Sequence, residues 1–336
     1  MIPIFEGPTA DHVWQQLAKA FQQPNIFHIQ TSRDGETKEI LHVAISIANP
    51  KQRWVISREP PLNLAFALAE VVWIMTGRRD LNFLGFWNHQ LWKYVGSGPA
   101  LHGAYGYRLR HHFGLDQLER AYDALIHKPD TRQVVLQIWD SKIDLPQIDG
   151  TPVNKDIPCN VMSIPKIRDG KLEWLQIIRS NDFLLGVQHN FVQFTCIQEI
   201  MAGWLGFECG SYNQISDSLH EYTHDEADIL SSTPLAQVIT NTDSLALPKT
   251  KSELLWEELG RRIELMIDPE LKQGKIEHYL RWDAPQAYQN ILAVLVAEAA
   301  RRHKWMDTAA GAMSTCNNPV YQEMWKHWCL RMSLPR

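Results

Sequence analysis

The stretch from residue 156 to residue 190 contains DIPCNVMSIP, a short turn and LEWLQIIRSNDFLLGVQHN. Apolar and β-branched residues lie on both sides of the turn-forming pair Asp169-Gly170, which predicts two paired strands over residues 161–165 and 174–179. The long apolar run over residues 191–205 has the length of a helix. A further short strand is expected over residues 209–214. This stretch therefore predicts a strand hairpin followed by a buried helix.

The same stretch carries polar residues in an unusual order. Cys159 is followed by an Arg-Ser-Asn-Asp run at residues 179–182, by Asn190, and by His220 and Tyr222. These are a thiol nucleophile and groups suited to an anion, a heterocycle edge and a sugar hydroxyl. For a lone cysteine, a buried structural thiol is the more common interpretation. The polar residues that follow favour a nucleophile.

Composition excludes several classes of protein. The chain has 336 residues, 45% of them apolar, and a net charge of −5, which argues against a broad nucleic-acid surface. Five scattered cysteines form no paired spacing, so we expect neither a disulfide framework nor a metal site. The longest near-apolar run, residues 291–300, is too short to span a bilayer, and the N-terminus does not resemble a signal peptide. We expect a cytoplasmic protein without a membrane partner.

The remaining chain divides by character near residue 235. Before it, helical and β-rich segments alternate; after it, only helical patterns occur. We expect a catalytic domain over residues 1–235 and a helical C-terminal extension over residues 236–336. The expected N-terminal elements are a helix over residues 9–21, strands over 26–30 and 40–47, helices over 61–76 and 115–126, and a strand over 134–139. The aromatic-rich segment over residues 81–95 is expected to be helical or irregular. The expected C-terminal helices are 252–266, 268–279, 287–303 and 320–332.

Glu70 lies inside the most regular of these helices, among apolar residues. Exposure to solvent is the simpler interpretation of a single carboxylate there. Burial would raise its pKa and make it a group that can handle protons. The residues alone leave both alternatives open.

The motifs between Glu70 and Tyr222, taken in order, resemble those of the thymidylate synthase family, which includes the pyrimidine hydroxymethylases. The matching segments are Glu70-Val-Val-Trp73 with Thr76-Gly77, Ala104-Tyr105-Gly106 with Arg110, Asp130-Thr-Arg132 with Trp139, Pro158-Cys159, Arg179-Ser180-x-Asp182, Gly186-Val-x-x-Asn190 and His220-x-Tyr222. The resemblance covers roughly residues 10–235. It implies an α/β (α+β) fold in which a mixed sheet packs with helices.

The resemblance also implies a reaction. The Cys159 thiolate would add to C6 of a uracil nucleotide, dUMP above all, and make C5 nucleophilic toward the one-carbon unit of 5,10-methylenetetrahydrofolate. Glu70 would order water and move protons at O4, and Tyr105 would help to remove the C5 proton. Asp182 would contact the pterin of the folate, with Trp92 and Gly186 lining that side.

The nucleotide contacts follow from the same resemblance. Asn190 would read the uracil edge, although an asparagine there could also cap the following helix. His220 and Tyr222 would bind the sugar 3′-hydroxyl. The 5′-phosphate contacts would be Arg33, Arg179 and Ser180 from one chain and Arg132 from a second chain, which implies a homodimer. Taken alone, Arg33 fits a solvated hairpin residue equally well.

Four departures from the family pattern concern the outcome of the reaction. Asn160 follows the nucleophile where His is usual, Gln133 replaces the second arginine of a pair, and His189 replaces the Phe against which folate packs. A helical region stands where the family has a short C-terminal lid that excludes water. Methylation of dUMP is the first expectation. The alternatives are hydroxymethylation of dUMP, UMP or a cytidylate, and a nucleotide-binding homologue that has lost the reaction.

Overall fold

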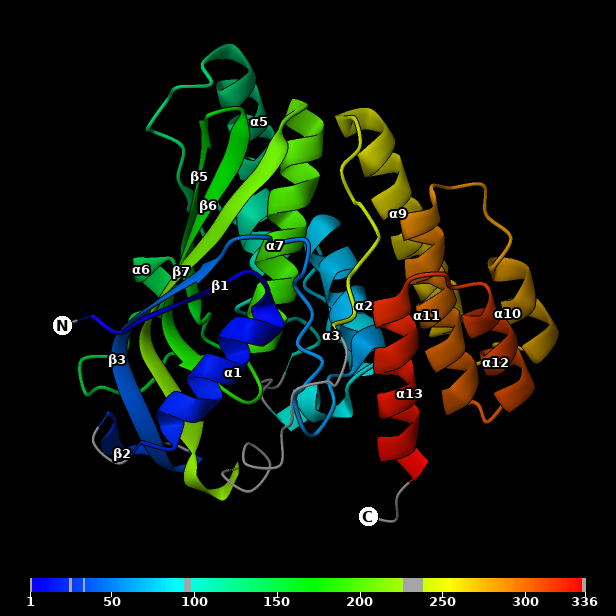
Figure 1. Ribbon diagram of the computed structural model, residues 1–336, viewed down its shortest axis with the longest axis horizontal. Helices are drawn as coiled ribbons and strands as arrows, with labels where there is room; N and C mark the ends of the chain where they lie inside the picture. Colours follow the sequence, from blue (N-terminus) through cyan, green and yellow to red (C-terminus); the bar gives the residue numbers. More distant parts are fainter. Residues whose placement is uncertain (1, 24–25, 33, 94–97, 226–237, 334–336) are drawn as a thin grey trace.

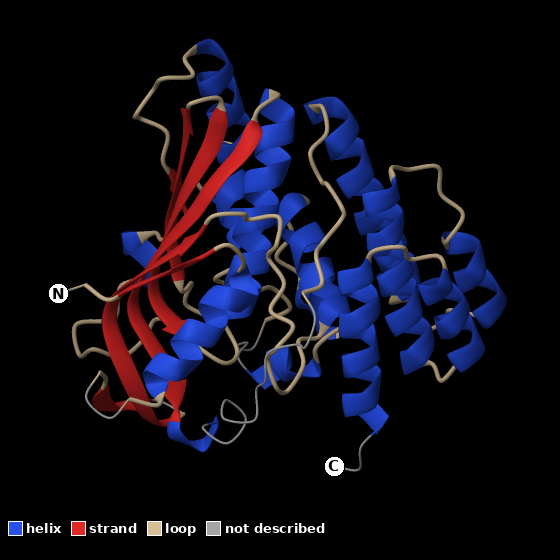
Figure 2. Cartoon of the chain, viewed as in Figure 1, coloured by secondary structure: helices blue, strands red, loops and turns tan. Residues whose placement is uncertain are grey.

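The structure is a computed structural model that describes residues 2–23, 26–32, 34–93, 98–225 and 238–333 (Figures 1 and 2). A mixed seven-stranded sheet has the strand order β1-β3-β7-β6-β5-β4, with β2 paired to β3. The strands are β1 Ile4–Gly7, β2 His28–Ser32, β3 Gly35–Ile47, β4 Leu136–Gln137, β5 Asn160–Arg168, β6 Lys171–Asp182 and β7 Glu208–Tyr222. The expected mixed sheet packed with helices is confirmed.

The β5–β6 hairpin confirms the strand pair expected from the sequence. Arg168 pairs with Lys171, so the loop contains only Asp169 and Gly170. Both loop residues have positive φ, 49° and 73°. Such values suit a two-residue hairpin turn and match the right-handed twist of the flanking strands.

Strand β7 is much longer than the segment expected over residues 209–214. Its inward-facing side chains include Gln214, Ser216 and Glu221, which are buried although they are polar. Because these polar residues occupy the buried positions, the strand lacks the alternation of apolar and polar residues by which strands are recognised. Strand β4 is shorter than expected, with two residues.

Helices cover one face of the sheet. Helix α1 (Ala10–Phe21) lies along β1 and β3, and the long helix α7 (Val187–Leu205) lies on β6 and β7 (Figure 1). Helix α2 (Leu64–Met75) packs on α7 and is almost entirely buried. The remaining elements before residue 226 are α3 Leu81–Gly85, η1 His89–Lys93, α4 Tyr105–Tyr107, η2 Arg108–His112, α5 Gln117–His127, α6 Ser141–Asp144 and η3 Thr223–Asp225.

The C-terminal region is helical, as expected, and forms a layer beside α2 on the side away from the sheet (Figure 1). Its helices are α9 Lys249–Met266, α10 Gln273–Tyr279, α11 Gln286–Arg302, α12 Met306–Ser314 and α13 Pro319–Ser333. Helices α9, α11 and α13 all contact α2, and α9 also contacts α7. The expected boundary at residue 235 lies outside the described residues and stays a prediction.

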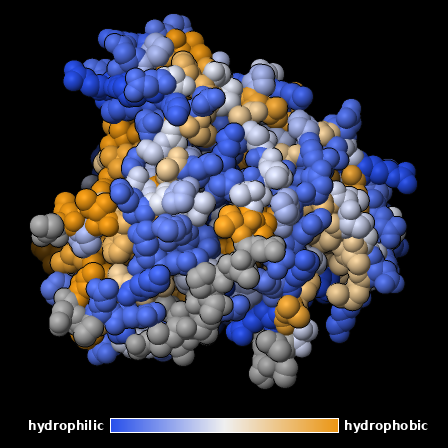
Figure 3. Space-filling model, viewed as in Figure 1, coloured by the Kyte–Doolittle hydropathy of each residue, from blue (hydrophilic) through white to orange (hydrophobic). Residues whose placement is uncertain are grey.

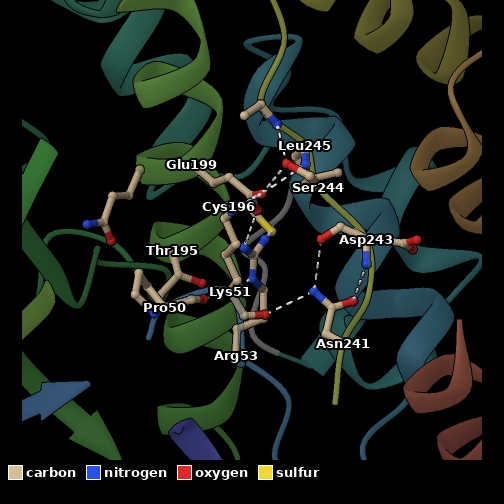
Figure 4. A network of polar contacts seen from close by, with 12 residues as sticks. Pro50, Lys51, Arg53, Thr195, Cys196, Glu199, Asn241, Asp243, Ser244 and Leu245 are labelled. Carbon is tan, nitrogen blue, oxygen red and sulfur yellow. Dashed lines mark hydrogen bonds and ion pairs between the residues drawn. The ribbon is translucent and has the colours of Figure 1, made fainter. Parts of the chain in front are cut away.

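A buried carboxylate of α7 binds both a buried arginine and the start of the C-terminal region (Figure 4). Arg53 pairs with Glu199 of α7, and both side chains are at most 2% exposed. The second carboxylate oxygen of Glu199 accepts hydrogen bonds from the Ser244 hydroxyl and the Leu245 amide, each at 3.0 Å. The hydrogen bonds from Ser244 and Leu245 therefore attach the start of the C-terminal region to α7, and Arg53 supplies the positive charge that compensates the buried Glu199 carboxylate.

Among the described residues, the helices α1 and α7 that pack on the sheet leave its other face uncovered. Half-buried apolar side chains lie on it, including Ile164, Leu175, Ile177 and Ile215. Figure 3 shows hydrophobic residues gathered on the side of the molecule where the sheet lies. In the described part of the chain, no helix is both long and apolar enough to cross a membrane.

Candidate active site

Cys159 lies immediately before β5, held against Arg179 of β6. The Arg179 amide donates to the Cys159 carbonyl at 2.9 Å. Its guanidinium donates to the carbonyl oxygens of Pro158 and Ile157 at 3.0 and 3.3 Å and lies over the Trp139 ring. A permanent positive charge is thus anchored to the segment that carries the thiol. Positive charge near a thiol favours the thiolate, which is the nucleophilic form.

Tyr105 shares the environment of Cys159. Burial raises the pKa of the Tyr105 phenol, and the negative charges of Cys159 and Glu70 raise this pKa further. A hydrogen bond from the Asn160 side chain opposes the shift. The phenol therefore stays protonated at neutral pH and can donate a hydrogen bond. The structure brings these four residues together from three different parts of the chain.

A glycine allows this arrangement. A Cβ atom on Gly106 would lie 2.4 Å from the Ile74 carbonyl oxygen, so only glycine lets the Tyr105 turn pack against α2. Arg108 then fixes the turn from the other side, because its buried guanidinium donates to the carbonyls of His102 and Ile138 and to Asp144. Sequence reasoning missed Arg108 and Asp144, which are 36 residues apart and have no local signal.

Glu70 is largely buried and faces α7. Its Oε2 lies 3.4 Å from Nδ1 of His189, and the two side chains are 16% and 17% exposed. Neither atom has a hydrogen-bond partner among the described residues. The His189 ring also meets the edge of Phe66, with ring centroids 5.1 Å apart. A carboxylate and an imidazole thus form a polar pair whose facing atoms are buried, although both side chains are partly exposed.

Asn190 belongs to a network of buried amides. The Asn160 amide nitrogen donates to Asn190 Oδ1 at 2.9 Å, and Asn190 Nδ2 donates to Asn181 Oδ1 at 3.0 Å. Helix α7 begins at Val187 with Gly186 as its N-cap, so the interpretation of Asn190 as a helix cap is wrong. Its amide is buried and firmly held, as a group that reads a base edge must be.

Asp182 and His220 lie side by side. They are Cα partners in the parallel pairing of β6 with β7, and Ser180 is likewise opposite Ser218. Burial raises the pKa of Asp182, although hydrogen bonding from the Leu185 amide and the charge of His220 oppose the shift. Tyr222 meets the His220 ring edge-on, with centroids 5.7 Å apart. The predicted sugar and folate contacts therefore adjoin one another.

The remaining folate-side residues are not all together. Gly186 packs on Asp182 so closely that a Cβ atom there would lie 2.9 Å from the Asp182 carbonyl oxygen. Trp92 lies on η1, is 51% exposed, and covers Gly85 with its indole. Among the described residues, no hydrogen bond or ring contact joins Trp92 to Asp182 or Gly186.

Two predicted phosphate ligands, Arg33 and Arg132, remain to be placed. Arg33 falls outside the described residues. Arg132 is exposed. Burial lowers the pKa of Lys166 on β5, and the positive charges of Arg168 and Arg132 lower this pKa further, so Arg132 lies close enough to Lys166 to act on it. This placement suits a ligand that a second chain would use. In the described residues no cluster of His, Cys, Asp and Glu side chains could hold a metal ion.

Comparison with known proteins agrees with the fold. The sequence pattern of the family described as thymidylate synthase matches residues 28–278. A deoxyuridylate hydroxymethyltransferase of Bacillus phage SP01 is 32% identical over 318 residues, which cover 84% of this chain and 82% of the relative. The chain belongs to the thymidylate synthase family. It is a transferase of that family, either a methyltransferase or a hydroxymethyltransferase.

Both hydroxymethyltransferases and thymidylate synthases are among the similar proteins. A deoxyuridylate hydroxymethyltransferase of Pseudomonas phage M6 is 35% identical over 194 residues, 57% of this chain and 53% of the relative. A thymidylate synthase of Clostridium beijerinckii is 25% identical over 158 residues, 46% of this chain and 56% of the relative. These two matches span about half of each relative, whereas the match to the SP01 protein spans most of both chains. The family match also continues past residue 235 into α10.

Proposed function

We propose that the chain is a deoxyuridylate hydroxymethyltransferase. It takes a one-carbon unit from 5,10-methylenetetrahydrofolate, attaches it to C5 of dUMP, and adds water to it. The relatives named deoxyuridylate hydroxymethyltransferase support this reaction over the methyl transfer expected first. The observation that carries the proposal is the Glu70–His189 pair.

The first half of the reaction is covalent capture of the nucleotide. The Cys159 thiolate adds to C6 of uracil, and the electron pair of the C5–C6 double bond moves onto C5 and O4. The Arg179 guanidinium is bound to the segment that carries Cys159, and Asn190 offers its amide to the base. His220 and Tyr222 take the sugar hydroxyl. After transfer, loss of the C5 proton breaks the bond between the one-carbon unit and the folate nitrogen, so that tetrahydrofolate leaves and an exocyclic methylene stays at C5. We assign Tyr105 to this proton through water.

The second half decides the product. A water molecule adds its oxygen to the methylene carbon, and its proton must pass to a base. The electron pair moves to O4 and then expels the Cys159 thiolate, which leaves 5-hydroxymethyl-dUMP. An imidazole paired with a carboxylate can hold and deprotonate this water, whereas the Phe usual at position 189 of the family cannot.

We assign folate binding to Asp182, Gly186 and Trp92. Asp182 is half-buried, and Gly186 packs so closely on it that a Cβ atom there would lie 2.9 Å from the Asp182 carbonyl oxygen. These residues therefore fit the group that supplies the one-carbon unit.

A homodimer completes the proposed site. The uncovered apolar face of the sheet would bury its side chains against a second copy, and Arg132 would then reach the partner's phosphate. We also propose that residues 1–235 form the catalytic domain and residues 236–336 a helical extension, which is joined to Glu199 by hydrogen bonds from Ser244 and Leu245.

The test identifies the products formed from the nucleotide and from the folate. The enzyme is incubated with dUMP and methylenetetrahydrofolate, and nucleotide and folate products are separated and weighed. We expect 5-hydroxymethyl-dUMP together with tetrahydrofolate, and no turnover with Cys159→Ala. Thymidylate together with dihydrofolate would refute hydroxymethylation, because methylation oxidises the folate. No consumption of dUMP would refute both reactions and favour a nucleotide-binding homologue.

A further inference from the structure

A chain of buried side chains leads from β6 to the amide that reads the base. Trp174 Nε1 donates to Gln176 Oε1 at 3.3 Å, and Gln176 Nε2 donates to Asn160 Oδ1 at 2.9 Å. Asn160 Nδ2 donates to Asn190 Oδ1, and Asn190 Nδ2 donates to Asn181 Oδ1. All five residues are at most 6% exposed. We call this chain the amide relay.

The amide relay has a direction. Each amide accepts through oxygen on one side and donates through nitrogen on the other, so turning one amide requires its neighbours to turn as well. The Ser163 hydroxyl also donates to Gln176 Oε1, at 2.6 Å, but a hydroxyl can accept instead. The Trp174 indole can only donate. If the Gln176 amide turned its nitrogen toward the indole, two donors would face each other. The Trp174 indole therefore favours one orientation of Gln176 and, through it, one direction of the whole relay.

The direction of the relay matters at Asn190. After its contacts with Asn160 and Asn181, the amide retains one hydrogen on Nδ2 and one lone pair on Oδ1. Uracil presents an N3–H donor beside an O4 acceptor, and cytosine presents the reverse. Rotation of the amide by half a turn would therefore exchange the preferred base.

We propose that Trp174 is a specificity-determining residue: acting through Gln176 and Asn160, it holds the Asn190 amide in the orientation that selects uracil over cytosine. This inference rests on the base-reading part of the proposed function. Trp174 is a positioning residue, because it acts through two other side chains. Its removal should change the ratio of affinities for two bases, which loss of packing alone would leave unchanged.

The test compares two conservative variants of buried tryptophans. Trp174→Phe removes the indole N–H and keeps an aromatic ring. Trp14→Phe makes the same change at a residue that is 0% exposed and whose indole nitrogen has no hydrogen-bond partner among the described residues. Calorimetry on the full chain without folate gives the dissociation constants of dUMP and dCMP for each variant.

We expect the preference for dUMP over dCMP to fall by about tenfold in Trp174→Phe, the loss expected for one hydrogen bond, and to stay at the wild-type value in Trp14→Phe. If Trp174→Phe does not fold, Gln176→Met interrupts the relay at the next residue and should lower the same ratio. An unchanged ratio in the folded relay variant overturns the inference, as does an equal loss in Trp14→Phe.

The measurement is independent of the fate of the transferred carbon. A lowered preference for dUMP over dCMP together with a methyl product would support the role of the relay and refute hydroxymethylation. A wild type that binds dUMP and dCMP equally would overturn the relay and the base-reading role of Asn190, whatever the product is.

Discussion

Replacement of His189 by phenylalanine should stop the hydration step and spare the capture of the nucleotide. The substitution restores the residue that is usual in the family at this position. It removes the imidazole whose Nδ1 lies 3.4 Å from the buried Oε2 of Glu70. The variant therefore isolates the imidazole from the remaining chemistry.

The size of the effect follows from the role of the imidazole. A positioned general base accelerates proton transfer by about 10²–10⁴-fold, so formation of 5-hydroxymethyl-dUMP should fall within that range. Stability should change little, by less than about 1.5 kcal/mol, because the two rings are similar in volume. The edge contact with Phe66, at 5.1 Å between centroids, can also be kept by an aromatic ring.

The assay follows two quantities in the same preparation. Product is counted by mass from dUMP and methylenetetrahydrofolate, and capture is counted as the covalent adduct with 5-fluoro-dUMP. We expect loss of product with unchanged adduct. His189→Gln serves as the control that keeps polarity without basicity, and it should lose product as well. Wild-type product formation in His189→Phe would refute the role of the imidazole.

Two further predictions concern stability and assembly. Arg53→Met leaves the Glu199 carboxylate buried without its partner, so the free energy of unfolding measured in urea should fall by about 3–5 kcal/mol. The control Lys326→Met, at a pair whose lysine is 66% exposed, should change this free energy by at most about 1 kcal/mol. Equal effects would contradict the role of the buried pair. Mixing inactive Arg132→Ala chains with inactive Cys159→Ala chains should restore part of the activity, because one shared site then has both residues, and persistent inactivity of the mixture would contradict a ligand donated by the second chain.

The sequence predicted the parts of the fold that follow local rules. The β5–β6 hairpin was predictable because Asp169-Gly170 is a strong turn signal between apolar runs. Helix α2 was predictable from its apolar periodicity, and Asn63 caps it through a hydrogen bond to the Phe66 amide. Helix α12 was missed because its buried face consists largely of Ala309 and Ala312, which give little hydrophobic contrast.

The candidate site was predictable where residues stand in ordered motifs. Tertiary contacts were not, because they join residues that are far apart in the chain. Gln176 and Asn181 look like ordinary strand or loop polar residues, yet both are buried and bonded to other amides. Glu70 could not be placed from its helix alone, since the group that it faces, His189, lies on α7.

Labelled water shows directly whether the C5 methylene is hydrated. The reaction with dUMP and methylenetetrahydrofolate is run in water enriched in heavy oxygen, and the nucleotide product is fragmented in a mass spectrometer. Hydration of the C5 methylene predicts one heavy oxygen in the product, located on the new one-carbon group. A product with an unlabelled methyl group at C5 would refute hydroxymethylation.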